Sequence, residues 1–408
     1  MPWAGGAGSA STVIEMIKYI GSKRTLVPLI TDLVRKLPVR SACDLFAGTT
    51  RVGQALRASG LVVHSNDLAT YAEAFGLAYI RADETVDRDR LQSVLDELSR
   101  LPGVDGYVTE AFCRKARFIQ PENGRRIDAI RSGIERYSLD EIERGIILTS
   151  LLEAADRVDS TTGVQMAYLK SWAPRSFRPL ELRMPAAVDG PAGTVTRLDA
   201  NELASGLSVD LVYIDPPYNR HSYFSNYHVW ETIVRWDNPE GYGIANKRMD
   251  CRERRSRYNS RRDAPVALRE AIGSLGAPWL LVSSNDEGFH GSKELERWLG
   301  EGRHVGRIAV DARRYVGAKI GIHNPSGVKV GTVGRLRNVE YLFLAGPDRA
   351  LIDTLVDEAQ RRGSASAPAV SQPAAAIGRN AAAGAANAIA VMSVPPPSAA
   401  TQGPFPLT

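Results

Sequence analysis

The stretch Asp210-Leu-Val-Tyr-Ile-Asp-Pro-Pro-Tyr218 decides the fold that we expect of this chain. Apolar and β-branched residues run from Leu211 to Ile214 and stop at Asp215, which two prolines follow. Because proline has no N–H to give to a strand ladder, a buried strand should end at this carboxylate. Open α/β sheets bind ligands just outside the carboxyl ends of their strands. The stretch therefore predicts a binding site with Asp215 in its wall and the flat ring of Tyr218 beside it.

A second unit, nearer the N-terminus, predicts two further strands of the same sheet. Residues 41–53 read as a short strand ending at Asp44, a glycine-containing turn and a helix, and a second strand ends at Asp67. In such a βαβ unit the turn and the helix N-terminus face a nucleotide, and the second acid can accept from both ribose hydroxyls. Before this unit, a Gly-Ser-Lys turn ending at Lys23 leads into a helix and can hold a carboxylate or a phosphate. These patterns predict a Rossmann-like α/β fold that binds a nucleotide.

Length and composition limit the class of protein. With 408 residues, 44% of them hydrophobic, the chain can form one large domain with an insertion or a small second domain. The 51 lysines and arginines exceed the 46 acidic residues only slightly, so local basic clusters matter more than the net charge. The three cysteines lie far apart without a Cys-x-x-Cys spacing, which favours the reducing cytoplasm over a disulfide framework or a zinc site. We expect no metal and, without a long apolar run or a signal pattern, no membrane association.

The composition changes along the chain predict its domain organisation. Between the nucleotide-binding unit and the later strands, about a hundred residues break the strand–helix alternation and indicate an inserted, mainly helical subdomain. Both ends are rich in small residues and are expected to be disordered, with Met16 as a second candidate start. The predicted segments are a disordered N-terminus (1–15), a cofactor-binding part (16–82), the insertion (83–190), a catalytic part (191–350) and a disordered tail (363–408).

Basic residues cluster in the insertion and after the stretch 210–218. In the insertion they alternate with Trp172 and Phe177, a pattern that suits phosphate contacts and stacking on bases. Between Lys247 and Arg262, eight basic residues stand against two acidic ones, which we interpret as a flexible loop that contacts phosphates. Ordinary solvated surface charge remains the alternative for both clusters. The candidate DNA-binding residues are Arg114, Lys115, Arg117, Lys170, Arg175, Arg178, Arg254, Arg255 and Arg257.

At this point the chain resembles the D12-class, Dam-like family of DNA adenine N6-methyltransferases. The tetrapeptide Asp-Pro-Pro-Tyr at 215–218 is that of amino-methyltransferases, and the other family motifs occur in the family's order over about residues 16–345. These are the segment Lys18-Tyr-Ile-Gly-Ser-Lys23, the turn Asp44-Leu-Phe-Ala-Gly48, the acid Asp67, an insertion in the place of target recognition, and Asn285-Asp-Glu287 after a strand. The resemblance implies a Rossmann-like methyltransferase sheet, S-adenosylmethionine as cofactor, duplex DNA as partner and a cognate restriction endonuclease as a candidate second partner.

Site residues follow from the same resemblance. It implies catalytic roles for Asp215, Pro216, Pro217 and Tyr218, with Asp215 and a carbonyl near Pro216 accepting hydrogen bonds from the adenine N6 and Tyr218 stacking on the flipped base. No metal is needed for this reaction. The implied cofactor-binding residues are Tyr19, Lys23, Asp44, Phe46, Gly48, Asp67 and Asp215.

Two positions depart from the family pattern, and the substrate stays open. Tyr19 stands where relatives often have tryptophan, and Thr50 stands where a second turn glycine is expected, so its branched side chain restricts the approach of the backbone to the cofactor. An RNA adenine or a DNA cytosine N4 presents the same exocyclic amine, and a non-catalytic DNA-binding relative could keep the same fold. The recognition sequence and the oligomeric state cannot be derived from these residues.

Overall fold

A seven-stranded sheet forms the centre of the computed structural model of this chain. The structure describes residues 17–365 apart from 20, 22, 162, 167, 170, 218–221, 287, 314–321, 324–328 and 332–336. In spatial order the strands are β3 (Thr194–Thr196), β2 (Val62–Asn66), β1 (Ser41–Asp44), β4 (Leu211–Ile214), β7 (Trp279–Asn285), β11 (Arg337–Gly346) and β8 (His304–Arg313). This arrangement confirms the predicted Rossmann-like sheet.

The strand directions determine where a ligand can bind. Neighbouring strands from β3 to β7 run parallel, whereas β11 is antiparallel to both β7 and β8. From β1 the chain builds one half of the sheet through β2 and β3, and then returns to start the other half at β4 beside β1. Ligands bind at such a topological switch point, outside the carboxyl ends of the strands. In this chain that point lies beyond Asp44 and Ile214.

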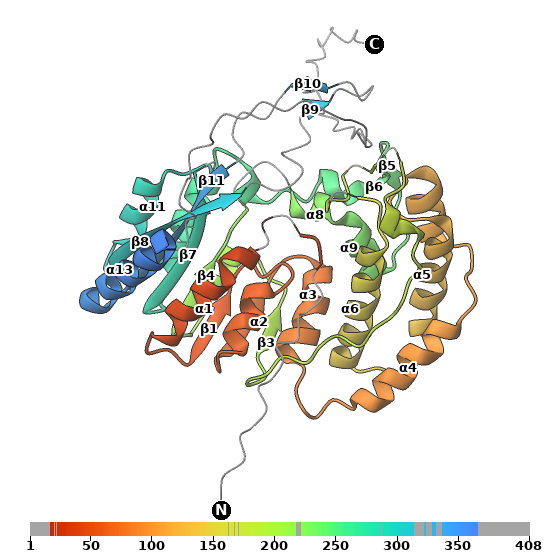
Figure 1. Cartoon of the computed structure of the whole chain (residues 1–408), viewed down its shortest axis with the longest axis horizontal. Coiled ribbons are helices and arrows are strands. Elements are labelled where there is room, and N and C mark those ends of the chain that lie inside the picture. The colour runs from red at the N-terminus through yellow and green to blue at the C-terminus, as the bar shows by residue number, and fades with distance from the viewer. Residues whose placement is uncertain are drawn as a thin grey trace, which may run out of the picture.

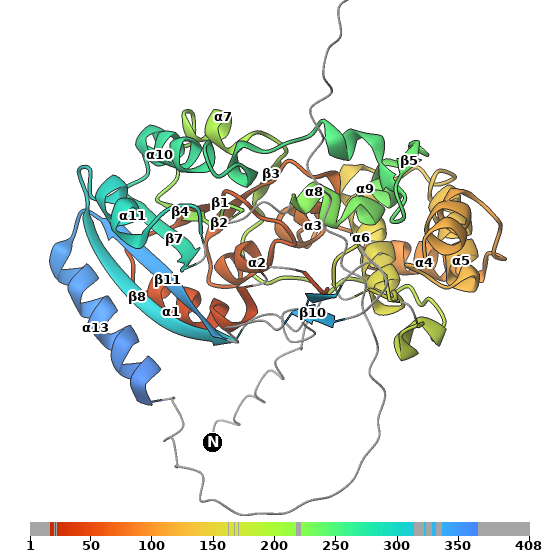
Figure 2. The same ribbon diagram turned by 90° about the horizontal axis from the view of Figure 1, so that it is seen from above.

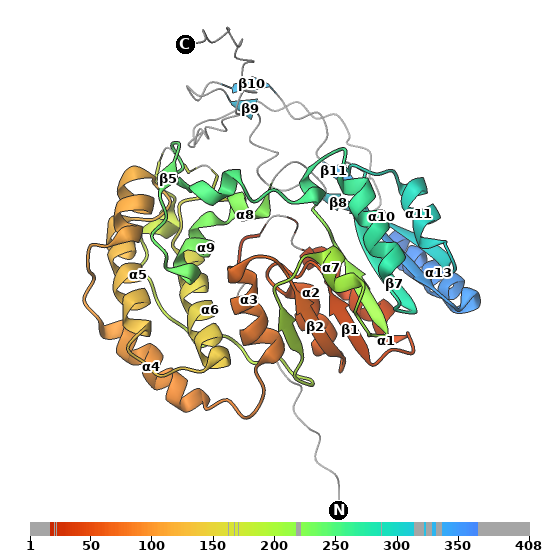
Figure 3. The same ribbon diagram turned by 180° about the vertical axis from the view of Figure 1, so that it is seen from behind.

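Helices cover both faces of the sheet, as the view from above shows (Figure 2). Side chains alternate along β4, so Leu211 and Tyr213 enter one apolar core while Val212 and Ile214 enter the other. The first core contains α1 (Val27–Arg35), α2 (Arg51–Arg57) and α13 (Arg349–Ala365), which lie in front of the sheet in Figure 1. The second contains α7 (Ala200–Ala204), α10 (Ala264–Ser274) and α11 (Ser292–Leu299), which face the viewer in Figure 3.

A helical region lies beside the β3 edge of the sheet (Figure 1). A Cβ on Gly76 would approach Val195 of β3 to 2.8 Å, so the first helix of the region packs tightly against that strand. One apolar core unites its helices, which are α3 (Thr70–Gly76), α4 (Arg88–Arg100), α5 (Pro121–Ile134), α6 (Glu141–Arg157) and α9 (His228–Arg235). This core includes residues on both sides of the predicted insertion 83–190, and those boundaries stay a prediction.

Short elements complete the described chain. Two small hairpins are formed by β5 (Gly241–Tyr242) with β6 (Lys247–Arg248) and by β9 (Ile322–His323) with β10 (Lys329–Gly331). The short helices and turns are η1 (Lys23–Thr25), η2 (Leu77–Arg81), η3 (Thr109–Lys115), η4 (Pro174–Phe177), α8 (Tyr223–Asn226), η5 (Met249–Arg252) and η6 (Arg257–Asn259). Among the described helices, none has both the length and the apolar character needed to cross a bilayer.

The basic run 247–262 is more ordered than the flexible loop expected from its charge. Arg248 is buried, and its guanidinium binds Asp237 at 2.6 Å and Asp250 at 3.1 Å. Tyr258 is buried as well, with its hydroxyl 2.8 Å from Asn201 Oδ1. The expectation of a flexible loop was therefore wrong, because two members of the run anchor it to the protein.

Candidate active site

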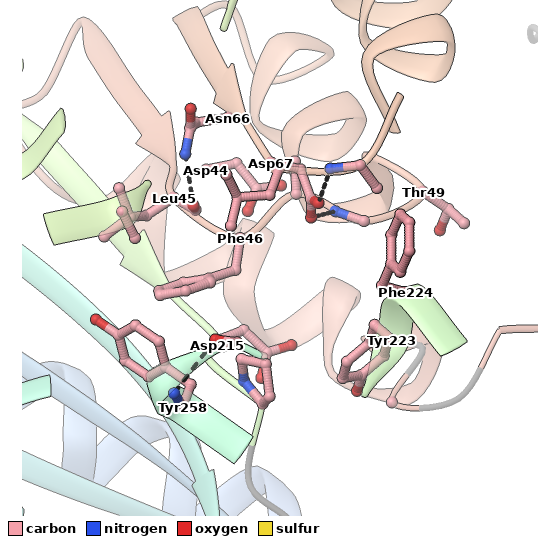
Figure 4. A pocket seen from close by; sticks show the side chains of 18 of the residues that line it. Asp44, Leu45, Phe46, Thr49, Asn66, Asp67, Asp215, Tyr223, Phe224 and Tyr258 are labelled. Carbon is pink, nitrogen blue, oxygen red and sulfur yellow. Dashed lines mark hydrogen bonds between the residues drawn. The ribbon is translucent and has the colours of Figure 1, made fainter. Parts of the chain in front are cut away.

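A cavity of about 570 Å³ opens at the switch point of the sheet. Three carboxylates in its wall come from three neighbouring strands: Asp44 ends β1, Asp67 follows β2 and Asp215 follows β4. Figure 4 shows them together with the side chains around them. The volume lies within the range of small-molecule and cofactor sites. The strand-end acids that the sequence singled out thus share one cavity.

Asp44 is the most deeply buried of these acids. One of its oxygens, Oδ2, accepts a hydrogen bond of 2.9 Å from the N–H of Gly53 in the first turn of α2. Burial is the main cause that raises the pKa of Asp44 to about 7; the nearby Asp215 and Asp67 contribute to this rise, and the bond from Gly53 opposes it. A bound cation would favour its ionised form. The carboxyl is therefore suited to an ammonium group.

Asp67 holds the turn that forms the cavity wall. Its Oδ2 accepts from Gly48 N at 2.9 Å, and its Oδ1 accepts from Ala69 N at 3.0 Å. Gly48 has a φ of +53°, and a Cβ there would approach the ring of Tyr19 to between 2.9 and 3.1 Å. Glycine is thus favoured at position 48 both by the backbone conformation and by the space that Tyr19 leaves.

Thr50, the departure from the family pattern, lies on the same turn. It adopts a left-handed conformation with φ +57°, which is unusual for a β-branched residue. Its hydroxyl donates to Thr49 O at 2.8 Å and accepts from Gln54 Nε2 at 3.0 Å. The threonine therefore keeps the backbone shape that a glycine would take, and its side chain is buried away from the cavity wall.

Aromatic rings form the wall next to the helical region. Tyr19 stacks on Tyr227 with ring centroids 4.4 Å apart and on Tyr223 at 5.4 Å, and Tyr227 stacks in turn on Trp230 at 4.7 Å. The Tyr19 hydroxyl lies 3.3 Å from that of Tyr71. Since Tyr227 and Trp230 belong to the core of the helical region, this stack joins that region to the cofactor side of the cavity.

Lys23 lies between two carboxylates rather than facing open solvent. Its ammonium is 3.2 Å from Asp215 Oδ1 and 3.3 Å from Glu340 Oε2, and its side chain is only 5% exposed. Burial would lower the pKa of Lys23, but Asp215 and Glu340 outweigh burial and raise it, so the ammonium stays protonated.

The tetrapeptide 215–218, which is predicted to be catalytic, is described in part. Asp215 and Pro217 line the cavity, whereas Pro216 is buried behind them. Tyr218 lies outside the described residues, and so does Lys170 of the DNA-binding set. The stacking role expected of Tyr218 therefore stays a prediction.

The residues present fit S-adenosylmethionine. The buried Asp44 suits its ammonium group, Asp67 has carboxylate oxygens at the place where a ribose would bind in this fold, and Phe46 packs edge-to-face on Tyr258 at 4.9 Å in the wall. Of the implied cofactor-binding residues, Tyr19, Lys23, Asp44, Phe46, Gly48, Asp67 and Asp215 all line this one cavity. Their individual contacts with the cofactor stay predictions.

Comparison with known proteins identifies the family. The family model of the D12 class N6 adenine-specific DNA methyltransferases matches residues 19–262. This chain belongs to that family. It is 32% identical over 309 residues to the modification methylase StsI of Streptococcus sanguinis, across 70% of this chain and 46% of StsI. It is 31% identical over 287 residues to the type II methyltransferase M.NlaIII of Neisseria lactamica, across 67% of this chain and 84% of M.NlaIII.

The extent of these matches differs. This D12 family member spans about half the length of StsI but most of M.NlaIII. Among solved structures, TehB from Haemophilus influenzae matches with a TM-score of 0.29 and 8% identity, across 78% of this chain and 61% of TehB.

The predicted DNA-binding residues of this D12 family member fall into three groups according to their contacts within the protein. Several are engaged in ion pairs within the protein: Arg114 with Asp105 at 2.7 Å, Arg175 with Asp159 at 2.7 Å, Arg257 with Glu270 at 2.8 Å, and Lys115 with Glu110 at 3.9 Å. Arg117 stacks over Trp172 and Arg254 over Phe224. Arg178 and Arg255 form no ion pair within the described part of the chain. Arg254, Arg255 and Arg257 line the same cavity as the carboxylates, whereas the other described members of the set do not.

The predicted site residues left out several residues that line the cavity. Tyr223, Phe224 and Tyr258 line it, and so does Asp199, which follows β3. The position of Asp199 after a strand gave the same signal as Asp44 and Asp67. Glu340, which contacts the cavity residue Lys23, had no such signal, because it lies near the start of a strand and not after its end.

Proposed function

We propose that this protein transfers a methyl group from S-adenosylmethionine to N6 of an adenine flipped out of duplex DNA. The observation that carries the proposal is the single cavity that unites Asp215 and Pro217 with Asp44, Asp67 and Tyr19. The family supports adenine over cytosine as the target base, since its description is specific for N6 of adenine.

The charges around the cavity suit such a reaction. S-adenosylmethionine supplies a methyl group on a positively charged sulfur. The acids Asp44, Asp67 and Asp215 in the wall favour a cationic ligand, while the exposed Arg254 and Arg255 at the same cavity favour a polyanion. A cationic cofactor and polyanionic DNA can therefore bind at the same cavity.

Asp215 would act on the target amine. The lone pair of N6 is delocalised into the purine ring, and hydrogen bonds from both N6 hydrogens draw the nitrogen toward tetrahedral geometry. The carboxylate of Asp215 and a backbone carbonyl near Pro216 would accept these bonds and stabilise the positive charge that N6 acquires as the N–C bond forms and the C–S bond breaks. S-adenosylhomocysteine would leave as the thioether, and N6 would then lose one proton to solvent. The rest of the rate enhancement comes from aligning sulfur, methyl and nitrogen.

The names of the relatives suggest the biological setting. StsI and M.NlaIII are named as a modification methylase and a type II methyltransferase. We infer that this protein, too, modifies a specific DNA site, with a restriction endonuclease as its candidate partner. Its three cysteines are free and buried, which agrees with the reducing cytoplasm that we infer as its location.

The direct test is transfer of labelled methyl to unmethylated duplex DNA, followed by digestion to nucleosides. We expect N6-methyladenine as the labelled product. Label in N4-methylcytosine, or label in RNA but not in DNA, would keep the site and overturn the substrate. Absence of transfer together with absence of cofactor binding in calorimetry would indicate a non-catalytic relative.

A further inference from the structure

Glu340 reaches Lys23, which lines the cavity, because β11 is reversed. Parallel strands bring residues at their carboxyl ends to the cavity, whereas an antiparallel strand brings residues near its amino end. Glu340 is the fourth residue of β11 and pairs with Asn285, the last residue of β7. It therefore lies at the same edge of the sheet as Asp215.

The three charged groups form a chain of contacts. Lys23 Nζ bridges Asp215 Oδ1 at 3.2 Å and Glu340 Oε2 at 3.3 Å. The exposed fractions of the Lys23, Asp215 and Glu340 side chains are 5%, 16% and 22%, so water screens these contacts little. One ammonium against two carboxylates leaves the group with a net negative charge.

This arrangement addresses a conflict in the proposed reaction. Asp215 must accept a hydrogen bond from an amine that becomes positive, and a lysine paired with Asp215 alone would weaken it as an acceptor. A second carboxylate also binds the ammonium, so the ammonium withdraws less electron density from Asp215 and Asp215 stays a stronger acceptor. We propose that Glu340 is a positioning residue that holds Lys23 between two acids and so preserves the acceptor strength of Asp215 in methyl transfer.

This inference rests on the proposed function, and Glu340 acts through Lys23 without touching the substrate. Replacing Glu340 by glutamine should lower the single-turnover rate of methyl transfer about tenfold at saturating cofactor and DNA. The Kd for S-adenosylmethionine should stay within about threefold. Glu340→Asp, which keeps the charge, should recover part of the lost rate.

The decisive comparison repeats the substitution in a chain without the lysine. In Lys23→Met there is no ammonium to share, so adding Glu340→Gln should change the rate by less than about twofold. An equal loss of rate in both backgrounds would show that Glu340 only stabilises β11 and does not act through Lys23. That result would overturn the proposal. So would a wild-type rate for Glu340→Gln. Glu358→Gln is the matched control, because Glu358 also pairs with a lysine, Lys36 at 2.7 Å, but on the exposed surface of α13.

A second readout does not depend on methyl transfer. NMR titration of the lysine side-chain nitrogens should show a lower pKa for Lys23 in Glu340→Gln than in the wild type, and no change in Glu358→Gln. An unchanged Lys23 pKa would overturn the inference even in an active enzyme. If the wild type methylates no DNA while the Lys23 pKa shifts as expected, the coupling of Lys23 to Glu340 stands and the proposed function fails.

Discussion

At the scale of single residues, the environment of Asp44 couples cofactor binding to protons. Its oxygen accepts from Gly53 N, but burial and two neighbouring acids hold its pKa at about 7. The free protein therefore contains both protonation states near neutrality. A ligand that brings a positive charge to Asp44 binds the protein in which Asp44 is ionised. Where Asp44 is protonated, binding must release that proton.

The affinity for S-adenosylmethionine should therefore depend on pH. Cofactor binding lowers the pKa of Asp44, so the affinity should rise as the pH increases toward about 7 and level off above it, with a limit of about tenfold per pH unit. Calorimetry in buffers of different ionisation enthalpy measures both the Kd and the proton released. The Asp44→Asn variant should bind more weakly and without this dependence. A wild-type Kd that is constant across this range would show that Asp44 does not contact a cationic group.

Gly48 offers a second test at this scale. Gly48→Ala should weaken cofactor binding at least about tenfold, because the new Cβ would displace the ring of Tyr19 as well as strain a φ of +53°. Gly60→Ala is the control, since Gly60 also has a positive φ, +91°, but no atom within 4 Å of the added Cβ. Both variants should lose about 1 kcal/mol in the free energy of unfolding. Equal cofactor Kd values would show that the position of Tyr19 does not matter.

The sequence was sufficient for the acids that follow strands and insufficient for the others. Asp44, Asp67 and Asp215 each end or follow an apolar run, and parallel strands bring such residues together. Glu340 could not be found in this way because the reversal of β11 is a property of the whole sheet. The ion pairs of Arg114 and Arg175 were equally invisible, since their partners are set by tertiary contacts.

At the scale of elements, α13 is the helix that the sequence analysis missed. Residues 351–362 were assigned to no segment, although Ile352, Leu355 and Ala359 have helical spacing and are buried on the sheet. The helix also extends to Ala365, three residues into the tail that was expected to be disordered. The helix approaches β8 closely at Gly306, where a Cβ would lie 2.5 Å from Val356 and 2.7 Å from Ile352. The change to small residues directly after this helix was interpreted as the start of a disordered tail, and the helical spacing before it was not used.

This packing predicts a large loss of stability from one truncation. Ile352→Ala should lower the free energy of unfolding by about 2–4 kcal/mol, because Ile352 is fully buried between α13 and the sheet. Urea denaturation followed by circular dichroism measures the change. The exposed Thr354 on the opposite side of the helix serves as control, and Thr354→Ala should be nearly neutral. Equal effects would contradict the close packing of α13.

At the scale of the whole molecule, two surfaces of opposite charge meet at one cavity. The acids belong to the strand ends of the sheet, and the arginines belong to the segment 254–257, which also lines the cavity. The helical region joins this centre through the stack of Tyr19, Tyr227 and Trp230.

The difference between paired and unpaired arginines predicts different salt dependence. Arg255→Ala should weaken binding to duplex DNA and reduce the slope of log Kd against log salt by roughly 0.9, the value expected for one lost phosphate contact. Arg175→Ala should leave the slope unchanged and lower stability instead, because Arg175 neutralises the buried Asp159. Fluorescence anisotropy at several salt concentrations measures both. A change of slope for Arg175 but not for Arg255 would reverse the assignment of the DNA-binding surface.

The central claim is that Asp215 activates the adenine amine, and a single-turnover measurement of methyl transfer by Asp215→Asn tests it most directly. Asparagine keeps the shape of the side chain and removes the charge, so we expect the rate to fall at least about a hundredfold while DNA binding is largely kept. Asp353→Asn, an exposed position on α13, is the control and should transfer at the wild-type rate. A wild-type rate for Asp215→Asn would contradict the account.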